Sequence, residues 1–185
     1  KTGGSCPGIM NALPSDQEML QLSILQSSIE KQVQEYYDCT FKNRVLLPGK
    51  SLLPPSGKLF DARELQLAVQ AVLDGCWTEG RFAKKFEKAF SAFTGVRPTI
   101  LTNSGSSANL VAFMSLTSPK LQDRRIRPGD QVIAVAAAFP TTVNPIIQAG
   151  AIPVFLDIDR QTYNIDCSLL EKAISEKTKA IFIAH

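Results

Sequence analysis

The spacing of apolar residues changes character about halfway along the chain. In the first half, apolar residues recur every three or four positions, which predicts amphipathic helices. One predicted helix spans Ser15–Asp38, and Ser15 with Glu18 forms a capping-box pattern at its start. A second predicted helix opens at Asp61, with Glu64 three residues later. The first half of the chain is therefore expected to be helical.

A third predicted helix carries four phenylalanines on one face. Phe82, Phe86, Phe90 and Phe93 recur at helical spacing, and Gly95 follows them. An aromatic stripe of this kind is typical of core packing rather than of a cofactor site. We therefore expect these rings to be buried.

Beyond Gly95, short apolar runs alternate with amphipathic segments. The runs are rich in β-forming residues and predict buried parallel strands, and the segments between them predict helices. This alternation predicts an α/β fold: a doubly wound, mostly parallel sheet with helices on both faces. The predicted strands are Pro98–Thr102, Gln131–Ala136, Ile152–Leu156 and Ala180–Ala184; the predicted helices are Gly105–Leu116, Thr142–Ala149 with Pro145 in its first turn, and Asp166–Glu176; Leu121–Asp130 is a predicted charged loop.

These patterns divide the chain into three expected segments. Residues 1–14 resemble a leader or a tag remnant, because they begin with a stretch rich in glycine, serine and proline. Residues 15–60 hold the first helix and an extended Pro/Gly-rich linker. Residues 61–185 are expected to form the first part of the α/β domain. The last strand ends the chain where open α/β sheets carry a functional loop, so we expect this domain to be incomplete.

Composition and charge exclude several functional classes. The 185 residues carry a net charge of +3 with scattered basic residues, which argues against a nucleic-acid partner. No apolar run is long enough for a membrane span, and no secretory signal is present. The single histidine, His185, argues against a Ser–His or Cys–His hydrolase and excludes a multi-histidine metal site. The four cysteines are widely spaced, which indicates reduced thiols, a cytoplasmic protein and no metal motif.

The first candidate for chemistry is the segment Thr102–Asn109, between a predicted strand and the start of a predicted helix. Gly105 allows a ligand to approach the backbone closely, and Ser106 and Ser107 add hydroxyl groups. The unpaired amides of a helix N-terminus favour a phosphate. The alternative is an ordinary helix cap with small residues for close packing. On the residues alone, both interpretations stay open.

Three further places could contact a ligand. Phe139 follows the small residues Ala136–Ala138 at the end of a predicted strand, where its ring could cover a flat ligand or could be ordinary core. Asp157 and Asp159 follow the next strand and suit either a ligand site or a solvated turn. The loop Trp77–Gly80 suits a ligand rim or a subunit interface.

Taken in order, these segments resemble the DegT/DnrJ-type sugar aminotransferases, a branch of the fold-type I pyridoxal-phosphate enzymes. Within that family the match is closer to the subgroup of CDP-4-keto-6-deoxyglucose 3-dehydrases, chiefly through Asn103–Phe113 and Phe139–Ile147. The segments that carry the resemblance are Asp74–Phe82, Asn103–Ala108, Phe139–Thr142, Phe155–Asp159, Tyr163–Asp166 and Lys177–Ile181 with His185.

The resemblance implies a cofactor, pyridoxamine 5′-phosphate or pyridoxal 5′-phosphate (PLP). Gly105, Ser106 and Ser107 would hold its phosphate and Phe139 would stack on its ring. The residues expected on the substrate side or at a subunit interface are Trp77, Thr78 and Gly80, with His185 beside the active-site loop.

The resemblance also implies a reaction and partners. The enzyme would remove the 3-hydroxyl of a nucleotide-linked 4-keto-6-deoxy sugar, in deoxysugar and O-antigen biosynthesis. We expect a homodimer, an NADH-dependent flavin/iron–sulfur reductase as partner, and a [2Fe–2S] cluster whose ligands lie outside this chain. No residue of this chain is assigned a catalytic role.

Two alternatives to the dehydrase stay open. The family's catalytic position, which is Lys in aminotransferases and His in the dehydrase, is expected beyond residue 185. The chain could therefore belong to a PLP-dependent nucleotide-sugar aminotransferase, or it could be a non-catalytic α/β ligand-binding segment. We expect these residues alone not to catalyse the reaction, because the partner of the ring nitrogen and the acid/base group are expected elsewhere.

Overall fold

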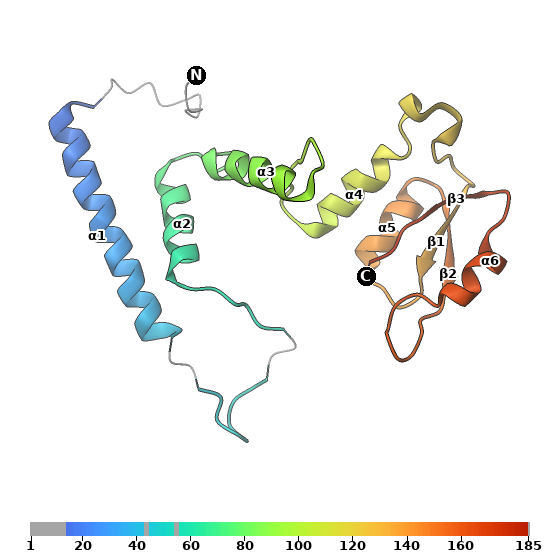
Figure 1. The fold of residues 1–185 in the computed structure, drawn as a ribbon, viewed down its shortest axis with the longest axis horizontal. Coiled ribbons are helices and arrows are strands. Elements are labelled where there is room, and N and C mark those ends of the chain that lie inside the picture. The colour runs from blue at the N-terminus through green and yellow to red at the C-terminus, as the bar shows by residue number, and fades with distance from the viewer. Residues whose placement is uncertain (1–13, 43–44, 54–55, 185) are drawn as a thin grey trace. The chain divides into compact units, whose positions relative to one another are not determined.

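The computed structural model describes residues 14–42, 45–53 and 56–184, and the chain forms two compact units, Lys1–Thr99 and Ile100–His185. His185 itself and the leader-like residues 1–13 lie outside the described residues. Figure 1 shows the order of the elements along the chain.

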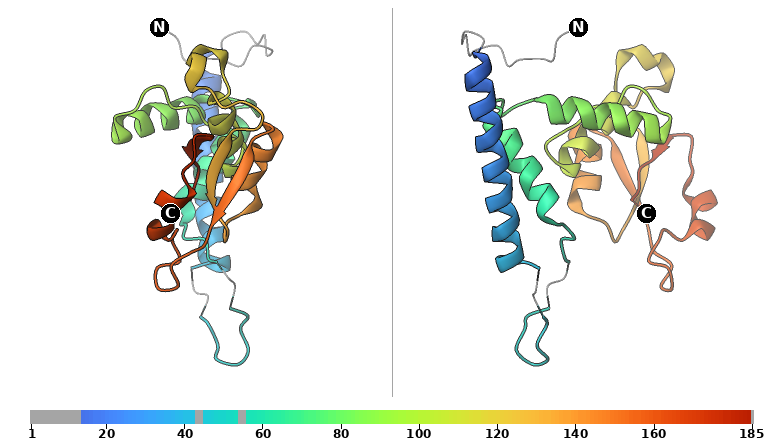
Figure 2. Two further views of the ribbon diagram at one scale, coloured as in Figure 1. Left: turned by 90° about the vertical axis from the view of Figure 1, so that its right-hand side faces the viewer. Right: turned by 60° about the vertical axis from the view of Figure 1, so that its left-hand side comes forward.

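The first unit contains the helices α1 (Asp16–Thr40), α2 (Ala62–Leu73) and α3 (Arg81–Thr94). The two predicted helix starts are confirmed as capping boxes. The side chains of Ser15 and Asp61 each accept a backbone hydrogen bond at a helix start. The carboxylates of Glu18 and Glu64 accept hydrogen bonds from the backbone amides of these two cap residues. Helices α1 and α2 pack side by side (Figure 2).

The expectation that the phenylalanine stripe of α3 is buried is wrong for this chain. Phe86, Phe90 and Phe93 are 48%, 44% and 87% exposed. The Phe86 and Phe90 rings stack on each other with centroids 5.5 Å apart instead of packing under another element. The stripe therefore has the sequence of a core helix without a covering element among the described residues.

The second unit is built on a parallel sheet of β1 (Gln131–Val135), β2 (Ile152–Leu156) and β3 (Thr178–Ile181). The spatial order is β2–β1–β3, so β1 is central (Figure 1). Both connections run through helices, as a doubly wound α/β fold requires. The predicted fold class, a parallel sheet with helices on both faces, is confirmed.

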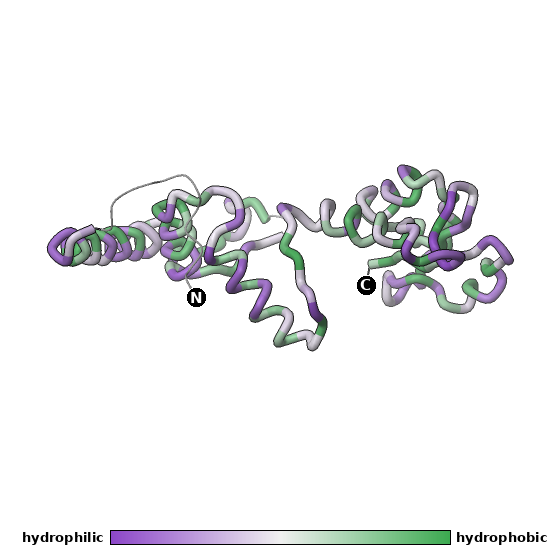
Figure 3. Tube along the Cα trace, turned by 90° about the horizontal axis from the view of Figure 1, so that it is seen from above, coloured by the Kyte–Doolittle hydropathy of each residue, from purple (hydrophilic) through white to green (hydrophobic). Residues whose placement is uncertain are grey.

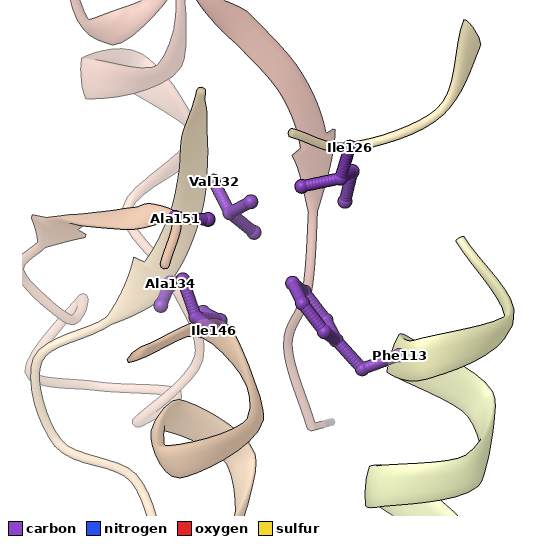
Figure 4. Packing of buried hydrophobic residues seen from close by; sticks show 6 residues of the cluster. All are labelled: Phe113, Ile126, Val132, Ala134, Ile146 and Ala151. Atoms are coloured by element: carbon purple, nitrogen blue, oxygen red, sulfur yellow. The ribbon is translucent and has the colours of Figure 1, made fainter. Parts of the chain in front are cut away.

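The residues of β1 alternate between the two faces of the sheet. Val132 and Ala134 face α4 (Gly105–Ser115) and α5 (Pro140–Gln148), where they pack with Phe113 and Ile146 (Figure 4). The other face packs against the 3-10 turn Cys167–Leu169 and α6 (Leu170–Ala173), and its buried residues are Ile133, Val135, Leu156 and Ile165. The β1 residues Val132, Ile133, Ala134 and Val135 are each at most 5% exposed, so the centre of the sheet is the core of this unit.

The predicted strand Pro98–Thr102 does not form. These residues do not adopt strand structure, and Ile100 is exposed. A strand needs a neighbour to satisfy its backbone groups, so β-forming residues alone do not make one. The predicted last strand is also shifted, since β3 begins at Thr178 and ends at Ile181.

Three further elements differ from their predicted bounds. The charged loop begins as a 3-10 helix, Pro119–Arg124, because Ser118 caps it and Pro119 fits its first position. The helix predicted for Asp166–Glu176 is short, since Ser175 bonds Thr178 and Gln131 instead of continuing it.

Helix α5 begins at Pro140, two residues earlier than predicted. Pro145 therefore lies in the second turn of the helix and not in the first. A proline at that place removes one backbone donor from the helix.

Hydrophilic and hydrophobic residues are mixed along α1 (Figure 3), and no helix in the described part of the chain is long and apolar enough to cross a membrane. Cys39 and Cys167 are free thiols, as expected. The expectation of reduced thiols is wrong for Cys76, which is disulfide-bonded. Cys6 lies outside the described residues.

Candidate functional site

The carboxyl end of β1 is the point where the chain changes direction across the sheet. From β1 the chain passes to β2 on one side, and then crosses to β3 on the other side. In open α/β sheets, ligands bind in the crevice at such a switch point, outside the carboxyl ends of the strands. The residues that follow Val135 at this end are Ala136–Ala138 and then Phe139. The sheet topology thus marks the segment that the sequence marked as a candidate site.

The predicted phosphate loop lies at the start of α4, in the same unit. Ser104 caps the helix: its Oγ accepts a hydrogen bond from the Ser107 amide at 3.1 Å, and its carbonyl accepts from the Ala108 amide at 3.0 Å. The amides of Gly105 and Ser106 have no acceptor among the described residues. Two N–H groups at the positive end of an eleven-residue helix are therefore free to bind an anion.

Space is available beside these amides. A Cβ atom placed on Gly105 would meet no other atom within 4 Å, and Gly105 and Ser106 are exposed. The two interpretations from the sequence are therefore compatible, because Ser104 acts as the cap while Gly105 and Ser106 stay available to a ligand.

A pocket of about 190 Å³ brings the phosphate loop and the start of α5 together. Ser106 and Ser107 line it from α4, and Thr141 and Asn144 line it from α5. Because Thr141 comes two residues after Phe139, the start of α4 and the aromatic segment are neighbours in space. The remaining lining residues are Leu110, Pro145 and Gln148.

Phe139 is not core in this chain. It is 81% exposed and occupies the N-cap position of α5, where its side chain makes no capping bond. Pro140 follows at the first helical position, so its fixed φ limits the backbone that carries the ring. The exposed ring is available to cover a flat ligand.

The loop with Trp77, Thr78 and Gly80 belongs to the first unit. Trp77 is exposed, and its Nε1 donates to the Val72 carbonyl at 3.1 Å. Gly80 is the N-cap of α3, and Arg81 beside it pairs with Asp74 at 2.6 Å. These contacts fix the loop locally, and the substrate-side or interface role of its residues stays a prediction.

The acidic segment after β2 is a turn. Asp159 Oδ1 accepts hydrogen bonds from the amides of Gln161 and Thr162 and from the Thr162 hydroxyl. The bond from the Thr162 amide is the main cause that lowers the pKa of Asp159. Asp157 bonds the amide of Ile158. No cluster of potential metal ligands occurs within residues 14–42, 45–53 and 56–184.

Asn109 lies within the candidate segment Thr102–Asn109, but the sequence assigned no role to its side chain or to the Thr141 carbonyl. Asn109 lies one turn after Gly105 on α4, and its Nδ2 donates to Thr141 O at 3.5 Å. A signal was present in the sequence: Pro145 stands four residues after Thr141, where it leaves a helix carbonyl without its usual donor.

Known proteins resemble the chain along most of its length. It is 55% identical to the lipopolysaccharide biosynthesis protein RfbH of Salmonella typhimurium, over 87% of this chain and 37% of RfbH. It is 46% identical to the dTDP-4-dehydro-2,6-dideoxy-D-glucose 3-dehydratase of Saccharopolyspora spinosa, over 74% of this chain and 30% of that enzyme. The chain thus spans about a third of the length of the curated relatives it matches.

Solved structures share the fold. The E. coli GDP-4-keto-6-deoxy-D-mannose 3-dehydratase with bound hydrated PLP matches with a TM-score of 0.62 and 36% identity, over 69% of this chain and 32% of that one. The family model for the DegT/DnrJ/EryC1/StrS aminotransferases matches residues 60–185. The chain therefore belongs to the DegT/DnrJ/EryC1/StrS aminotransferase family.

Proposed function

We propose that the protein containing this chain is a pyridoxamine-phosphate-dependent 3-dehydrase. Its substrate would be a CDP-linked 4-keto-6-deoxyhexose, from which it removes the 3-hydroxyl in deoxysugar and O-antigen biosynthesis. The observation that carries the proposal is the pair of unpartnered amides at the start of α4, beside the switch point of the sheet.

The residues at this site fit the phosphate of PLP or pyridoxamine 5′-phosphate. Gly105 and Ser106 offer amides, Ser106 and Ser107 offer hydroxyls, and Gly105 leaves open space in front of them. A dianionic phosphate suits this set of donors, since hydrogen bonds to a charged acceptor are stronger than those between neutral groups. In the proposal, these three residues hold the phosphate.

Phe139 would orient the cofactor ring. Its exposed side chain follows the carboxyl end of β1, where a flat ligand at the switch point would meet it. When bound, the cofactor supplies an electron sink that makes loss of the 3-hydroxyl possible. The residues of this chain bind and orient it, and the acid/base group is expected outside the chain.

The relatives support a dehydrase acting on a nucleotide sugar. RfbH is a lipopolysaccharide biosynthesis protein, and the other two relatives described above are 3-dehydratases of dTDP- and GDP-linked sugars. We propose CDP as the nucleotide of the substrate, on the basis of the subgroup resemblance in Asn103–Phe113 and Phe139–Ile147.

A PLP-dependent nucleotide-sugar aminotransferase is the second candidate. The family that contains the chain is described as an aminotransferase family, and the same phosphate site and aromatic ring would serve both reactions. In this case the amino group would be transferred to the keto carbon and the 3-hydroxyl would stay.

The proposal extends to the parts of the protein around this site. Residues 61–185 would be the first part of the cofactor-binding domain, and the protein would act as a homodimer. Trp77, Thr78, Gly80 and His185 would lie on the substrate side or at the subunit interface. Replacement of the 3-hydroxyl by hydrogen needs two electrons, which an NADH-dependent reductase would deliver through a [2Fe–2S] cluster.

The proposed function is tested with the full-length protein. It is incubated with pyridoxamine 5′-phosphate, the CDP-4-keto-6-deoxy sugar, a reductase of the proposed class and NADH, and the product is analysed by mass. We expect a product that lacks one oxygen atom. A product that has gained nitrogen and kept its 3-hydroxyl would favour the aminotransferase, and an unchanged sugar together with no cofactor binding would refute both.

A further inference from the structure

We infer that Asn109 is a positioning residue that sets the distance between the phosphate loop and the ring of Phe139. The inference rests on the proposed function, because it assigns a role within the same cofactor site. It starts from a side-chain hydrogen bond between α4 and α5, from Asn109 Nδ2 to Thr141 O, which joins residues 32 positions apart in the chain.

The acceptor of this bond is a carbonyl left free by a proline. In α5, the carbonyl of Thr141 would normally accept from the backbone of residue 145, four positions later. Pro145 has no amide hydrogen, so this carbonyl has no donor at that position of its own helix. Asn109 supplies a donor from the neighbouring helix.

The donor lies on the face of α4 that connects the site to the core. Gly105, Asn109 and Phe113 are spaced four residues apart and therefore share one face. Phe113 is fully buried and packs with Ile146 of α5 (Figure 4). On this face, Asn109 lies between the buried Phe113 and Gly105, where the free amides are.

The acceptor lies beside the aromatic residue. Thr141 follows Phe139 by two residues, and Thr142 next to it is buried. The ring of Phe139 is 81% exposed, so its own packing does not fix its position. The backbone of this segment fixes the position of the ring. The hydrogen bond from Asn109 to Thr141 O connects this backbone to α4, which carries the phosphate loop.

The bond is long, at 3.5 Å, so its contribution to folding is small. Its effect on a ligand that touches both parts of the site is larger, because the loop and the ring must stand at the right separation. Asn109 is therefore expected to matter for PLP and not for inorganic phosphate, which contacts the loop alone.

The test compares N109A and N109D with wild-type in the full-length protein. N109D keeps the volume of the side chain and turns an oxygen toward the Thr141 carbonyl. We expect the Kd for PLP to rise about three- to tenfold in N109A, as for loss of one hydrogen bond, and at least as much in N109D. The visible circular dichroism per bound PLP should fall, while the affinity for inorganic phosphate should be unchanged.

A matched control is N164D, the same change in the exposed turn after β2, which should leave all three quantities unchanged. The P145A variant restores a backbone donor for Thr141, so N109D should cost less PLP affinity in that background. Unchanged PLP affinity and dichroism in N109D would overturn the inference alone, as would equal losses of PLP and phosphate affinity. A wild-type protein that binds no PLP would overturn the proposed function as well.

Discussion

At the scale of single residues, stability and proposed function are assigned to different side chains. Phe113 and Ile146 are fully buried and make the core, whereas Gly105, Ser106 and Phe139 are exposed at the candidate site. An exposed large aromatic side chain beside unpartnered amides stabilises little in the free protein. The two groups of residues should therefore respond differently to substitution.

F139A is expected to weaken cofactor binding without weakening the fold. Loss of a stacked ring should raise the Kd for PLP by about one order of magnitude, since ring pairs contribute about 0.5–1.5 kcal/mol beyond the area they bury. The thermal midpoint of the cofactor-free protein should stay within about 1–2 °C of wild-type, because surface substitutions have small effects. F139W, which keeps an aromatic ring, is the control and should retain binding. A large loss of thermal stability in F139A would show that the ring is core.

Among the helices and strands, local features such as helix caps were predicted better than the pairing of strands. The capping boxes of α1 and α2 and the bounds of β2 were predictable because capping and apolar runs are local signals. The strand predicted at Pro98–Thr102 fails because a strand depends on a neighbour that the local sequence does not encode.

The candidate site was predictable in part for the same reason. The free amides at Gly105 and Ser106 follow from a helix start, which the sequence marks with Ser104 and the glycine. The bond between Asn109 and Thr141 was not predicted, since it joins two helices far apart in the chain. The sequence allowed Phe139 to be either a core residue or a ligand contact, and its exposure in the structure excludes the core.

F113A is expected to loosen α4 from the sheet. Phe113 is 0% exposed, and its ring packs against Phe182 with centroids 5.4 Å apart as well as against Ile146. Removal of a buried phenylalanine ring leaves a cavity and costs about 3–5 kcal/mol of the free energy of unfolding. Denaturant unfolding of the full-length protein measures this loss. V111A, a substitution on the exposed side of the same helix, is the control, and equal effects of both changes would contradict the packing described for α4.

At the scale of the whole molecule, the first unit exposes large apolar side chains that an interaction surface would bury. The stripe of Phe86, Phe90 and Phe93 and the side chain of Trp77 are exposed in this chain, which spans about a third of its relatives. Contiguous exposed apolar residues mark interaction surfaces. The rest of the protein or a second subunit would cover them.

The full-length protein is therefore expected to be a homodimer. Light scattering at micromolar concentration should give twice the mass of one chain. The F93S variant, with a polar group in the stripe, measures whether this face takes part in the interface, and the exposed S115A variant on α4 is a control outside the stripe. A monomeric mass with full activity would contradict the dimer.

A titration of the full-length protein with PLP, in wild-type and in the double variant S106A/S107A, shows whether the start of α4 holds the cofactor phosphate. Each hydroxyl that bonds the phosphate contributes about 1.5–3 kcal/mol, so loss of both should raise the Kd by at least about a hundredfold. S115A, a serine change on the same helix outside the pocket, should bind like wild-type. Wild-type protein that binds no PLP, or a double variant that binds it with unchanged affinity, would contradict the assignment of the phosphate site to the start of α4.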